Sequence, residues 1–233
     1  MQRRPRHIHP TAALAPRALL PGDPGRALLL AQALTDGPRM FNHNRGLWGY
    51  TGEAVDGEPL TIMSHGLGGP SAAIVVEELC DLGLEAFVRV GTCGALDPQL
   101  HLGDLVAATA VIAADGTSRA LGAGDTVSGD EAITSELVSR ADHGGLVVST
   151  DLFYDPDPAR PAAWRTAGAI AVEMEAASVL SVAERRGVRA GCLFAVSDGE
   201  PGAGARIDDD ALEAVSLRLG RAALDALLAA GGG

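Results

Sequence analysis

Residues 86–94 read Ala86-Phe87-Val88-Arg89-Val90-Gly91-Thr92-Cys93-Gly94, an apolar strand that ends in glycine and carries one arginine inside it. An unpaired charge in a core strand is costly, so Arg89 requires either a carboxylate or a bound anion as its partner. Gly91 permits close backbone approach at the end of the strand, and Thr92 offers a hydroxyl. Cys93 has no accompanying histidine motif and is interpreted as a small buried side chain rather than a nucleophile. The stretch predicts a buried strand that ends at a salt bridge or an anion site.

Short apolar runs alternate with helical patterns on both sides of this strand. Further strands are predicted at 17–20, 47–55, 60–64, 104–113, 146–149 and 189–197, and helices at 24–34, 71–81, 131–141, 175–186 and 208–230. Asp56-Gly57 is typical of a two-residue hairpin turn, and Ser71 is placed to cap a helix. No change in composition marks a domain boundary. The pattern predicts a single α/β domain over residues 1–233, with a central mixed β-sheet flanked by helices.

The charged residues and cysteines exclude several classes of protein. All 18 residues counted as Lys or Arg are arginine, which excludes a phosphate-loop lysine, a Schiff-base lysine and the kinase strand lysine. The net charge is 18 − 30 = −12, which disfavours nucleic acid and anionic membranes as partners. The three cysteines have no CxxC spacing and predict neither a disulfide framework nor a zinc site. We therefore expect a soluble cytoplasmic protein without a metal.

Three more segments place reactive side chains beyond predicted strand ends, where the ligands of α/β sheets collect. Leu20-Pro21-Gly22-Asp23-Pro24-Gly25-Arg26 fits an anion site at a helix N-terminus, or a tight turn with a solvent-facing arginine. Val172-Glu173-Met174-Glu175 puts two carboxylates at a helix start, where they complement the helix dipole or accept hydrogen bonds from vicinal sugar hydroxyls. Ser197-Asp198 ends an apolar strand, which suits a shielded carboxyl group acting as a general acid, or a turn cap.

The glycine-rich segment 66–71 also follows a strand and precedes a helix, as a dinucleotide-binding loop does. It departs from that pattern because Pro70 and Ser71 replace the region of the third glycine, and the next strand does not end in an acid that could hold a ribose. We do not interpret it as a dinucleotide site.

Together these segments resemble the nucleoside phosphorylase-I family, and within it the hexameric bacterial purine nucleoside phosphorylases. The resemblance extends from about residue 7 to residue 198 and keeps the family's order. It is carried by Gly22-Asp23-Pro24-Gly25-Arg26, Asn44-Arg45-Gly46 with Gly49-Tyr50-Thr51-Gly52, His65-Gly66-Leu67-Gly68, Arg89-Val90-Gly91-Thr92-Cys93-Gly94-Ala95, Val172-Glu173-Met174-Glu175-Ala176 and Ser197-Asp198.

The resemblance implies a role for each matching residue. The residues that would bind phosphate are Gly22, Arg26, Arg89 and Thr92, with Arg45 supplied by a neighbouring subunit. Those that would contact the ribose are Leu67, Met174 and Glu175, with His7 again supplied across a subunit boundary. Those that would surround the base are Cys93, Gly94, Phe153, Val172, Glu173, Ser197 and Asp198. The family therefore implies a homo-oligomer, a hexamer built from dimers with shared sites.

The implied reaction is the reversible phosphorolysis of purine ribonucleosides and deoxyribonucleosides to the free base and the sugar 1-phosphate. Asp198 and Glu175 would be the catalytic residues: Asp198 protonates purine N7, and Glu175 orients the sugar and stabilises its developing positive charge. Inorganic phosphate is a co-substrate, and no cofactor is needed. Adenosine-active members carry a further arginine beyond the acid, and here Arg206 is the candidate. His9 is the alternative to His7 at the ribose.

Three other functions stay open at this point. A uridine phosphorylase would not need an acid facing purine N7. A nucleosidase, which uses water in place of phosphate, would leave three arginines unexplained. A nucleoside-binding module without activity would need the same pocket but no phosphate.

Overall fold

One sheet of ten strands runs through residues 4–199 and 204–231, the part of the chain that the computed structural model describes. The strands are β1 (Arg17–Leu20), β2 (Asp36–Asn42), β3 (Gly49–Glu53), β4 (Pro59–Met63), β5 (Ala86–Ala95), β6 (Leu105–Ala114), β7 (Thr126–Val127), β8 (His143–Thr150), β9 (Ala169–Glu173) and β10 (Arg189–Asp198). The helices are α1 (Pro24–Leu34), α2 (Gly69–Leu82), α3 (Gly116–Ala120), α4 (Glu131–Val138), α5 (Arg160–Thr166), α6 (Ala176–Arg186) and α7 (Asp209–Gly231), with a short 3₁₀ turn at Asn44–Gly46.

Part of the sheet closes on itself. The strand order is β10-β6-β8-β9-β5-β1-β4-β3-β2, and β10 also pairs with β5. This extra pairing joins β5, β10, β6, β8 and β9 into a ring, from which β1, β4, β3 and β2 extend as an open sheet. The pairs β5–β10, β6–β8 and β8–β9 are parallel, whereas β10–β6 and β9–β5 are antiparallel. The predicted mixed sheet is confirmed, and the ring was not predicted.

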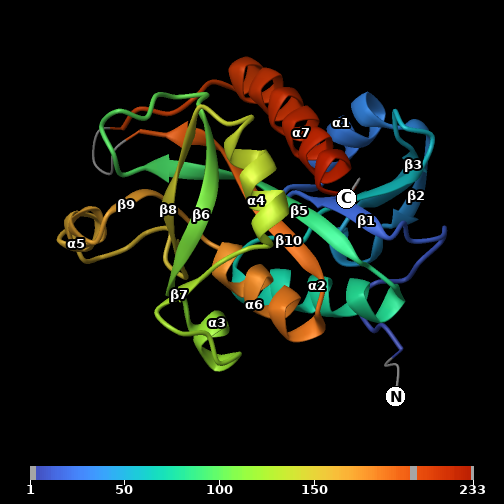
Figure 1. Cartoon of the computed structure of the whole chain (residues 1–233), viewed down its shortest axis with the longest axis horizontal. Helices are drawn as coiled ribbons and strands as arrows, with labels where there is room; N and C mark the ends of the chain where they lie inside the picture. The colour runs from blue at the N-terminus through green and yellow to red at the C-terminus, as the bar shows by residue number, and fades with distance from the viewer. Residues whose placement is uncertain (1–3, 200–203, 232–233) are drawn as a thin grey trace.

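Helices cover the sheet on both sides, as expected (Figure 1). Helices α2 and α6 lie side by side and bury residues such as Val76 and Val179 against one face. Helices α1, α4 and α7 pack on the other face through residues such as Leu30, Ile133 and Leu219. Among the described residues, none of these helices has the combination of length and apolar character that crossing a membrane requires.

The helix boundaries follow from local sequence signals. Asp23 accepts a hydrogen bond from the backbone N–H of Arg26 at 2.6 Å, with Pro24 in the first turn of α1. Gly83 and Gly187 end α2 and α6 in the left-handed conformation, with φ of 105° and 65°, which glycine adopts without the steric cost of a Cβ.

Two local predictions are wrong. Ser71 does not cap α2, which begins at Gly69; its hydroxyl instead donates to the carbonyl oxygen of His65 at 2.7 Å. The β3–β4 hairpin exists, but its loop spans residues 54–58, because Glu53 pairs with Pro59. The longer loop holds Gly57 at φ 81°, so the glycine is needed although the two-residue turn is not formed.

The topology brings three strand ends to one place. Arg89 on β5 pairs with Leu20, the last residue of β1, on one side and with Cys192 of β10 on the other. The turn that follows Leu20 therefore begins directly beside Arg89. Further along, Asp198 of β10 pairs with Gly94 of β5, and Gly94 also pairs with Val172 of β9.

Candidate active site

Arg89 lies at the centre of a buried ion-pair cluster. Its side chain is almost inaccessible, and the residue is 2% exposed. Its Nε and Nη2 donate to Glu173 Oε2 at 3.0 and 2.7 Å, and Nη2 also donates to Glu175 Oε2. Burial lowers the pKa of Arg89, but Glu175 and Glu173 raise it by more, so that the net pKa is above its ordinary value. The partner that this arginine requires is thus a pair of carboxylates in the ligand-free chain.

Glu173 is engaged on both of its carboxylate oxygens. Besides Arg89, it accepts hydrogen bonds from the Ser149 hydroxyl and from the backbone N–H groups of Glu175 and Ala176 at 2.9 Å. It therefore both neutralises Arg89 and satisfies free N–H groups at the start of α6. Its expected contact with the base stays a prediction.

Glu175 connects Arg89 to the loop before α2. Its Oε1 accepts a hydrogen bond from the backbone N–H of Gly68 at 2.6 Å, and its Oε2 accepts from Arg89. Burial raises the pKa of Glu175, Arg89 lowers it and Glu173 raises it, with a net upward shift. Both oxygens of Glu175 are therefore in use, so a sugar hydroxyl that donates to this carboxylate must share an oxygen with the Gly68 N–H or with Arg89.

Arg26 approaches Arg89 from the turn after β1. Its Nε donates to the Ser216 hydroxyl of α7 at 3.2 Å. Burial lowers the pKa of Arg26, Asp23 raises it, and the positive charge of Arg89 lowers it again. In the same turn, a Cβ on Gly22 would lie 3.1 Å from the carbonyl oxygen of Gly66, so a side chain there would press against the neighbouring loop. Two interacting cations, Arg26 and Arg89, beside a tightly packed turn make an arrangement that can bind an anion. Thr92 on β5 is half-buried.

Asp198 lies at the rim of the site. The Ser197 hydroxyl donates to Asp198 Oδ2 at 2.7 Å, and Arg206 Nε is 4.0 Å from Asp198 Oδ1. The side chain of Asp198 is 36% exposed, so the expectation of a carboxyl group shielded from water is wrong for the free chain. The strand carries Asp198 one step beyond the buried run that ends at Val196. Residues 200–203, which stand between Asp198 and Arg206 in the sequence, lie outside the described residues.

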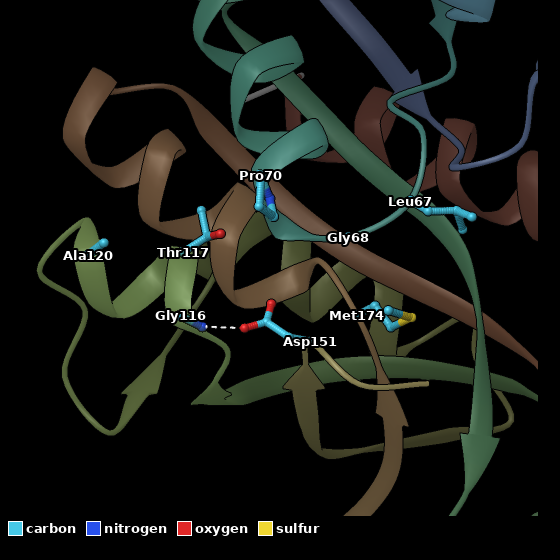
Figure 2. Close-up of a pocket in the computed structure, with 8 residues that line it drawn as sticks. All are labelled: Leu67, Gly68, Pro70, Gly116, Thr117, Ala120, Asp151 and Met174. Atoms are coloured by element: carbon cyan, nitrogen blue, oxygen red, sulfur yellow. Dashed lines mark hydrogen bonds between the residues drawn. The ribbon is translucent and has the colours of Figure 1, made fainter. Parts of the chain in front are cut away.

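A pocket of about 680 Å³ opens beside the ion-pair cluster of Arg89, Glu173 and Glu175, next to the Gly68 N–H that donates to Glu175. Figure 2 shows that its walls come from the loop before α2 and the first turn of that helix, from α3, from the residue after β8 and from the β9–α6 junction. Leu67 and Met174, the predicted ribose contacts, both line it. The other lining residues, which were not predicted, are Gly68, Pro70, Gly116, Thr117, Ala120 and Asp151. Asp151 is held in place because it accepts a hydrogen bond from the Gly116 N–H at 2.7 Å (Figure 2).

The aromatic residue expected at the base is exposed in this chain. Phe153 is 62% exposed and packs edge-on against Tyr154, with ring centroids 4.9 Å apart. Cys93 is buried, and burial raises the pKa of its thiol far above the ordinary range, which agrees with its interpretation as a packing residue rather than a nucleophile.

His7 and Arg45 are not brought into this cluster by their own chain. His7 Nδ1 is 2.7 Å from Glu78 Oε1, in the second half of α2, whereas the pocket lies at the first turn. Arg45 is exposed at φ 59° in the 3₁₀ turn. His9, the alternative to His7, has its Nε2 3.3 Å from the carbonyl oxygen of Arg6.

One buried side chain of the cluster was not singled out from the sequence. His65 is fully buried, and its Nε2 is 2.5 Å from Arg89 Nη1. The signal was present in the sequence, because this histidine stands between a strand and the run Gly66-Leu67-Gly68. Its spatial proximity to Arg89, 24 residues further along the chain, depends on the pairing of β4, β1 and β5.

Comparison with known proteins finds relatives that match most of this chain. The chain is 42% identical over 195 residues to guanosine phosphorylase of Halorubrum lacusprofundi, covering 80% of this chain and 79% of that protein. It is 34% identical over 201 residues to the DeoD-type purine nucleoside phosphorylase of Geobacillus kaustophilus, covering 81% and 83%. It is also 34% identical over 200 residues to uridine phosphorylase of Escherichia coli, covering 77% and 78%. Residues 16–229 match the Phosphorylase superfamily as a whole, and the chain therefore belongs to that family.

Proposed function

We propose that this protein cleaves purine nucleosides with phosphate, releasing the free base and ribose 1-phosphate. Family membership supports a phosphorylase, and the relatives described above act, by their names, on guanosine, purine nucleosides and uridine. The observation that favours this activity most is the meeting of Arg26, Arg89 and Glu175 beside a pocket lined by Leu67 and Met174. Cations for phosphate and a carboxylate for sugar hydroxyls are then adjacent.

Phosphate binds at the turn after β1, between Arg26 and Arg89. Arginine has five N–H donors, and Arg89 uses four of them on Glu173, Glu175 and His65. One N–H on Nη1 of Arg89 is left for a phosphate oxygen. The Nη2 N–H that now donates to Glu175 becomes available as well when Glu175 turns to the ribose. Gly22 and Thr92 also contact the phosphate, and Arg45 from a neighbouring subunit neutralises part of the phosphate's negative charge.

The sugar lies between the phosphate and the base. Glu175 accepts hydrogen bonds from the ribose hydroxyls, and Met174 and Leu67 pack against the ring. As the C–N bond breaks, the sugar becomes oxocarbenium-like, and the nearby carboxylate stabilises the developing positive charge. His7 from the neighbouring subunit contacts the 5′-hydroxyl.

Asp198 acts on the leaving base. Placed beside the backbone of Cys93 and Gly94, with Ser197 donating to one of its oxygens, it gives a proton or hydrogen bond to purine N7. Arg206, whose Nε is 4.0 Å from Asp198 Oδ1, is the candidate to assist this acid. Phe153 and Val172 flank the base, and a contact of Glu173 with the base stays a prediction.

A single assay separates the candidate functions. Release of base from guanosine, inosine, adenosine and uridine is measured with phosphate and in phosphate-free buffer. We expect turnover of the purine nucleosides only with phosphate. Equal rates without phosphate would instead identify a nucleosidase, and preference for uridine would identify a uridine phosphorylase. Binding of nucleoside without turnover would leave only the binding module.

The shared site is tested by mixing subunits. Arg45→Ala and Glu175→Ala variants are each expected to be inactive, because each lacks one part of every site. After exchange of subunits, some sites contain both intact residues, so activity should reappear. A fully active monomer in sedimentation experiments would contradict the shared site, and with it the homo-oligomer of hexameric type.

A further inference from the structure

His65 is a buried histidine to which the reaction described so far gives no role. It follows β4 and is fully buried, with its ring nitrogen Nε2 2.5 Å from Arg89 Nη1. A guanidinium has only donors, so Nε2 must accept this hydrogen bond. The proton of the neutral ring is therefore on Nδ1.

The surroundings keep this ring neutral. Burial lowers the pKa of His65 well below its ordinary value, and the positive charges of Arg89 and Arg26 lower it further. The Nδ1 atom makes no hydrogen bond of good geometry among the described residues, although the backbone of Gly66 and of His65 itself interacts with the ring and partly offsets the lowering of its pKa. Leaving a buried donor unpaired costs free energy, so a side chain that only filled space here would be better apolar. The contact with Arg89 is what the histidine provides.

The backbone of His65 ties this contact to the turn after β1. Its N–H donates to the carbonyl oxygen of Pro21 at 2.9 Å, and the N–H of Gly66 donates to Gly22 at 3.1 Å. A Cβ on Gly22 would lie 3.5 Å from the Cε1 atom of the His65 ring. The ring thus stands between Arg89 and the turn that carries Gly22 and Arg26.

We propose that His65 is a positioning residue for phosphate, a neutral acceptor that holds one side of the Arg89 guanidinium so that its remaining N–H meets a phosphate oxygen beside Gly22. The carboxylates fix the Nε and Nη2 side of the guanidinium, and His65 fixes the Nη1 side. This inference rests on the proposed phosphate site. It assigns to His65 no contact with the nucleoside, and so predicts an effect on one substrate only.

The test compares variants that keep or remove the acceptor. His65→Gln retains an oxygen near the position of Nε2, whereas His65→Leu removes the acceptor and also the unpaired donor. Phosphate and guanosine are varied separately in steady-state kinetics. We expect His65→Leu to raise the KM for phosphate about tenfold or more, the effect of one lost charge-assisted hydrogen bond. The KM for guanosine should stay within about twofold, and His65→Gln should recover most of the loss.

A second readout needs no turnover. Inorganic phosphate should raise the melting temperature of the wild-type protein and of His65→Gln, and raise that of His65→Leu less at the same concentration. The melting temperature of His65→Leu without phosphate is expected to fall, because the buried Nη1 N–H of Arg89 loses its acceptor. The readout is therefore the further shift that phosphate produces in each protein. If that variant does not fold, His65→Asn replaces it, since its side chain is too short to reach Arg89.

Arg89→Met distinguishes the two ways of failing. If it raises the KM for phosphate and His65→Leu does not, the role of His65 is overturned and the proposed function stands. If Arg89→Met leaves the KM for phosphate unchanged, the phosphate site itself is wrong and both proposals fail. An equal rise in both KM values for His65→Leu, unrelieved in His65→Gln, would mean that the histidine serves only the fold.

Discussion

Arg89 and Asp198 lie on neighbouring strands, β5 and β10, yet their surroundings differ in burial and in the number of partners. Arg89 is enclosed, with four hydrogen bonds to Glu173, Glu175 and His65. The side chain of Asp198 is more than one-third exposed, and within residues 4–199 and 204–231 its side-chain partners are Ser197 and, at 4.0 Å, Arg206. The phosphate end is therefore organised before any ligand binds, whereas Asp198 at the base end is held by fewer contacts among the described residues. Substitutions at the two ends should differ in what they damage.

Apart from the inactive Arg45→Ala and Glu175→Ala variants described above, the largest effect on rate is expected from Asp198→Asn. Asparagine still donates a hydrogen bond but delivers no proton, and general acid catalysis typically contributes about 10²–10⁴-fold. Turnover of adenosine should fall by this order, and that of 6-oxopurine nucleosides should fall less because their base spreads charge onto O6. A 7-methylated purine nucleoside already carries its positive charge and should be cleaved almost normally. The same fall for all three substrates would mean that Asp198 only binds or supports structure.

The exposure of Asp198 makes this a clean experiment. Because the side chain has few partners, the unfolding transition of Asp198→Asn in urea should match that of the wild type. A large loss of stability would contradict the contrast between the two ends of the site.

The largest effect on stability is expected from Glu173→Gln at the other end. It leaves Arg89 with one carboxylate and places an amide donor where Ser149 and the α6 N–H groups now donate. Removing one partner of a buried ion pair typically costs about 3–5 kcal/mol. Urea unfolding should show a loss of this order. Glu184→Gln, which removes the same charge from the exposed face of α6, is the control and should unfold like the wild type.

The sequence was informative about Arg89 and Asp198 for different reasons. That Arg89 needs a partner follows from one strand, because burial of a charge is a local consequence of apolar neighbours. Its partners could not be derived in this way, because Glu173 and Glu175 are 84 and 86 residues away and meet it only through the β5–β9 pairing. The exposure of Asp198 depends on where β10 ends relative to its neighbours, which no local pattern specifies.

Strands β9 and β2 were not predicted, again because local sequence patterns do not reveal them. Strand β9 (Ala169–Glu173) is short and runs directly into α6, so in the sequence Val172 and Glu173 resemble the start of that helix. Strand β2 (Asp36–Asn42) lies at the edge of the sheet, and its first five residues are exposed. Such a strand lacks the apolar signal that identifies the buried ones. Without β9 in the prediction, the closed ring could not be seen.

A smaller loss of stability is expected from Gly91→Ala, which tests whether the position of the Arg89 guanidinium is fixed by its neighbours. A Cβ there would lie 2.9 Å from Arg89 Nη2 and 3.1 Å from Phe194 Cδ1. Overpacking of this kind typically costs about 1–3 kcal/mol, and the guanidinium must shift. We expect a lower melting temperature together with a higher KM for phosphate.

Gly191→Ala is the matched control on the adjacent strand. Its Cβ would meet Ile133 Cγ2 at 2.6 Å and Leu137 Cδ1 at 2.7 Å, within the core and away from Arg89. This variant should also lose stability, but its KM for phosphate should not change. If both variants raise that KM equally, general loosening of the fold explains the effect and Arg89 is not specifically preorganised.

The smallest expected effect is on the stability of the fold in acid, and it tests whether His65 stays neutral in the folded chain. Its pKa is lowered in the folded chain, so below about pH 6.5 the unfolded chain binds a proton that the folded chain does not. Stability contributed by this group is therefore lost as the pH falls through about 6.5, at up to about 1.4 kcal/mol per pH unit.

Other groups also change the stability of the fold with pH. Glu175 has the opposite effect, because its raised pKa makes the folded chain bind more protons than the unfolded chain above the ordinary range of a glutamate. The carboxylates with lowered pKa, Asp104 and Asp130 among them, act only at lower pH. Because these groups are common to the wild type and to His65→Gln, the difference between the two proteins reports His65 alone. Urea unfolding at pH 7.5 and pH 5.5 should show a loss smaller by about 1 kcal/mol in His65→Gln. An identical loss in both proteins would mean that His65 takes up its proton in the folded state as well, and that the interior around Arg89 is less closed to charge than the contrast with Asp198 requires.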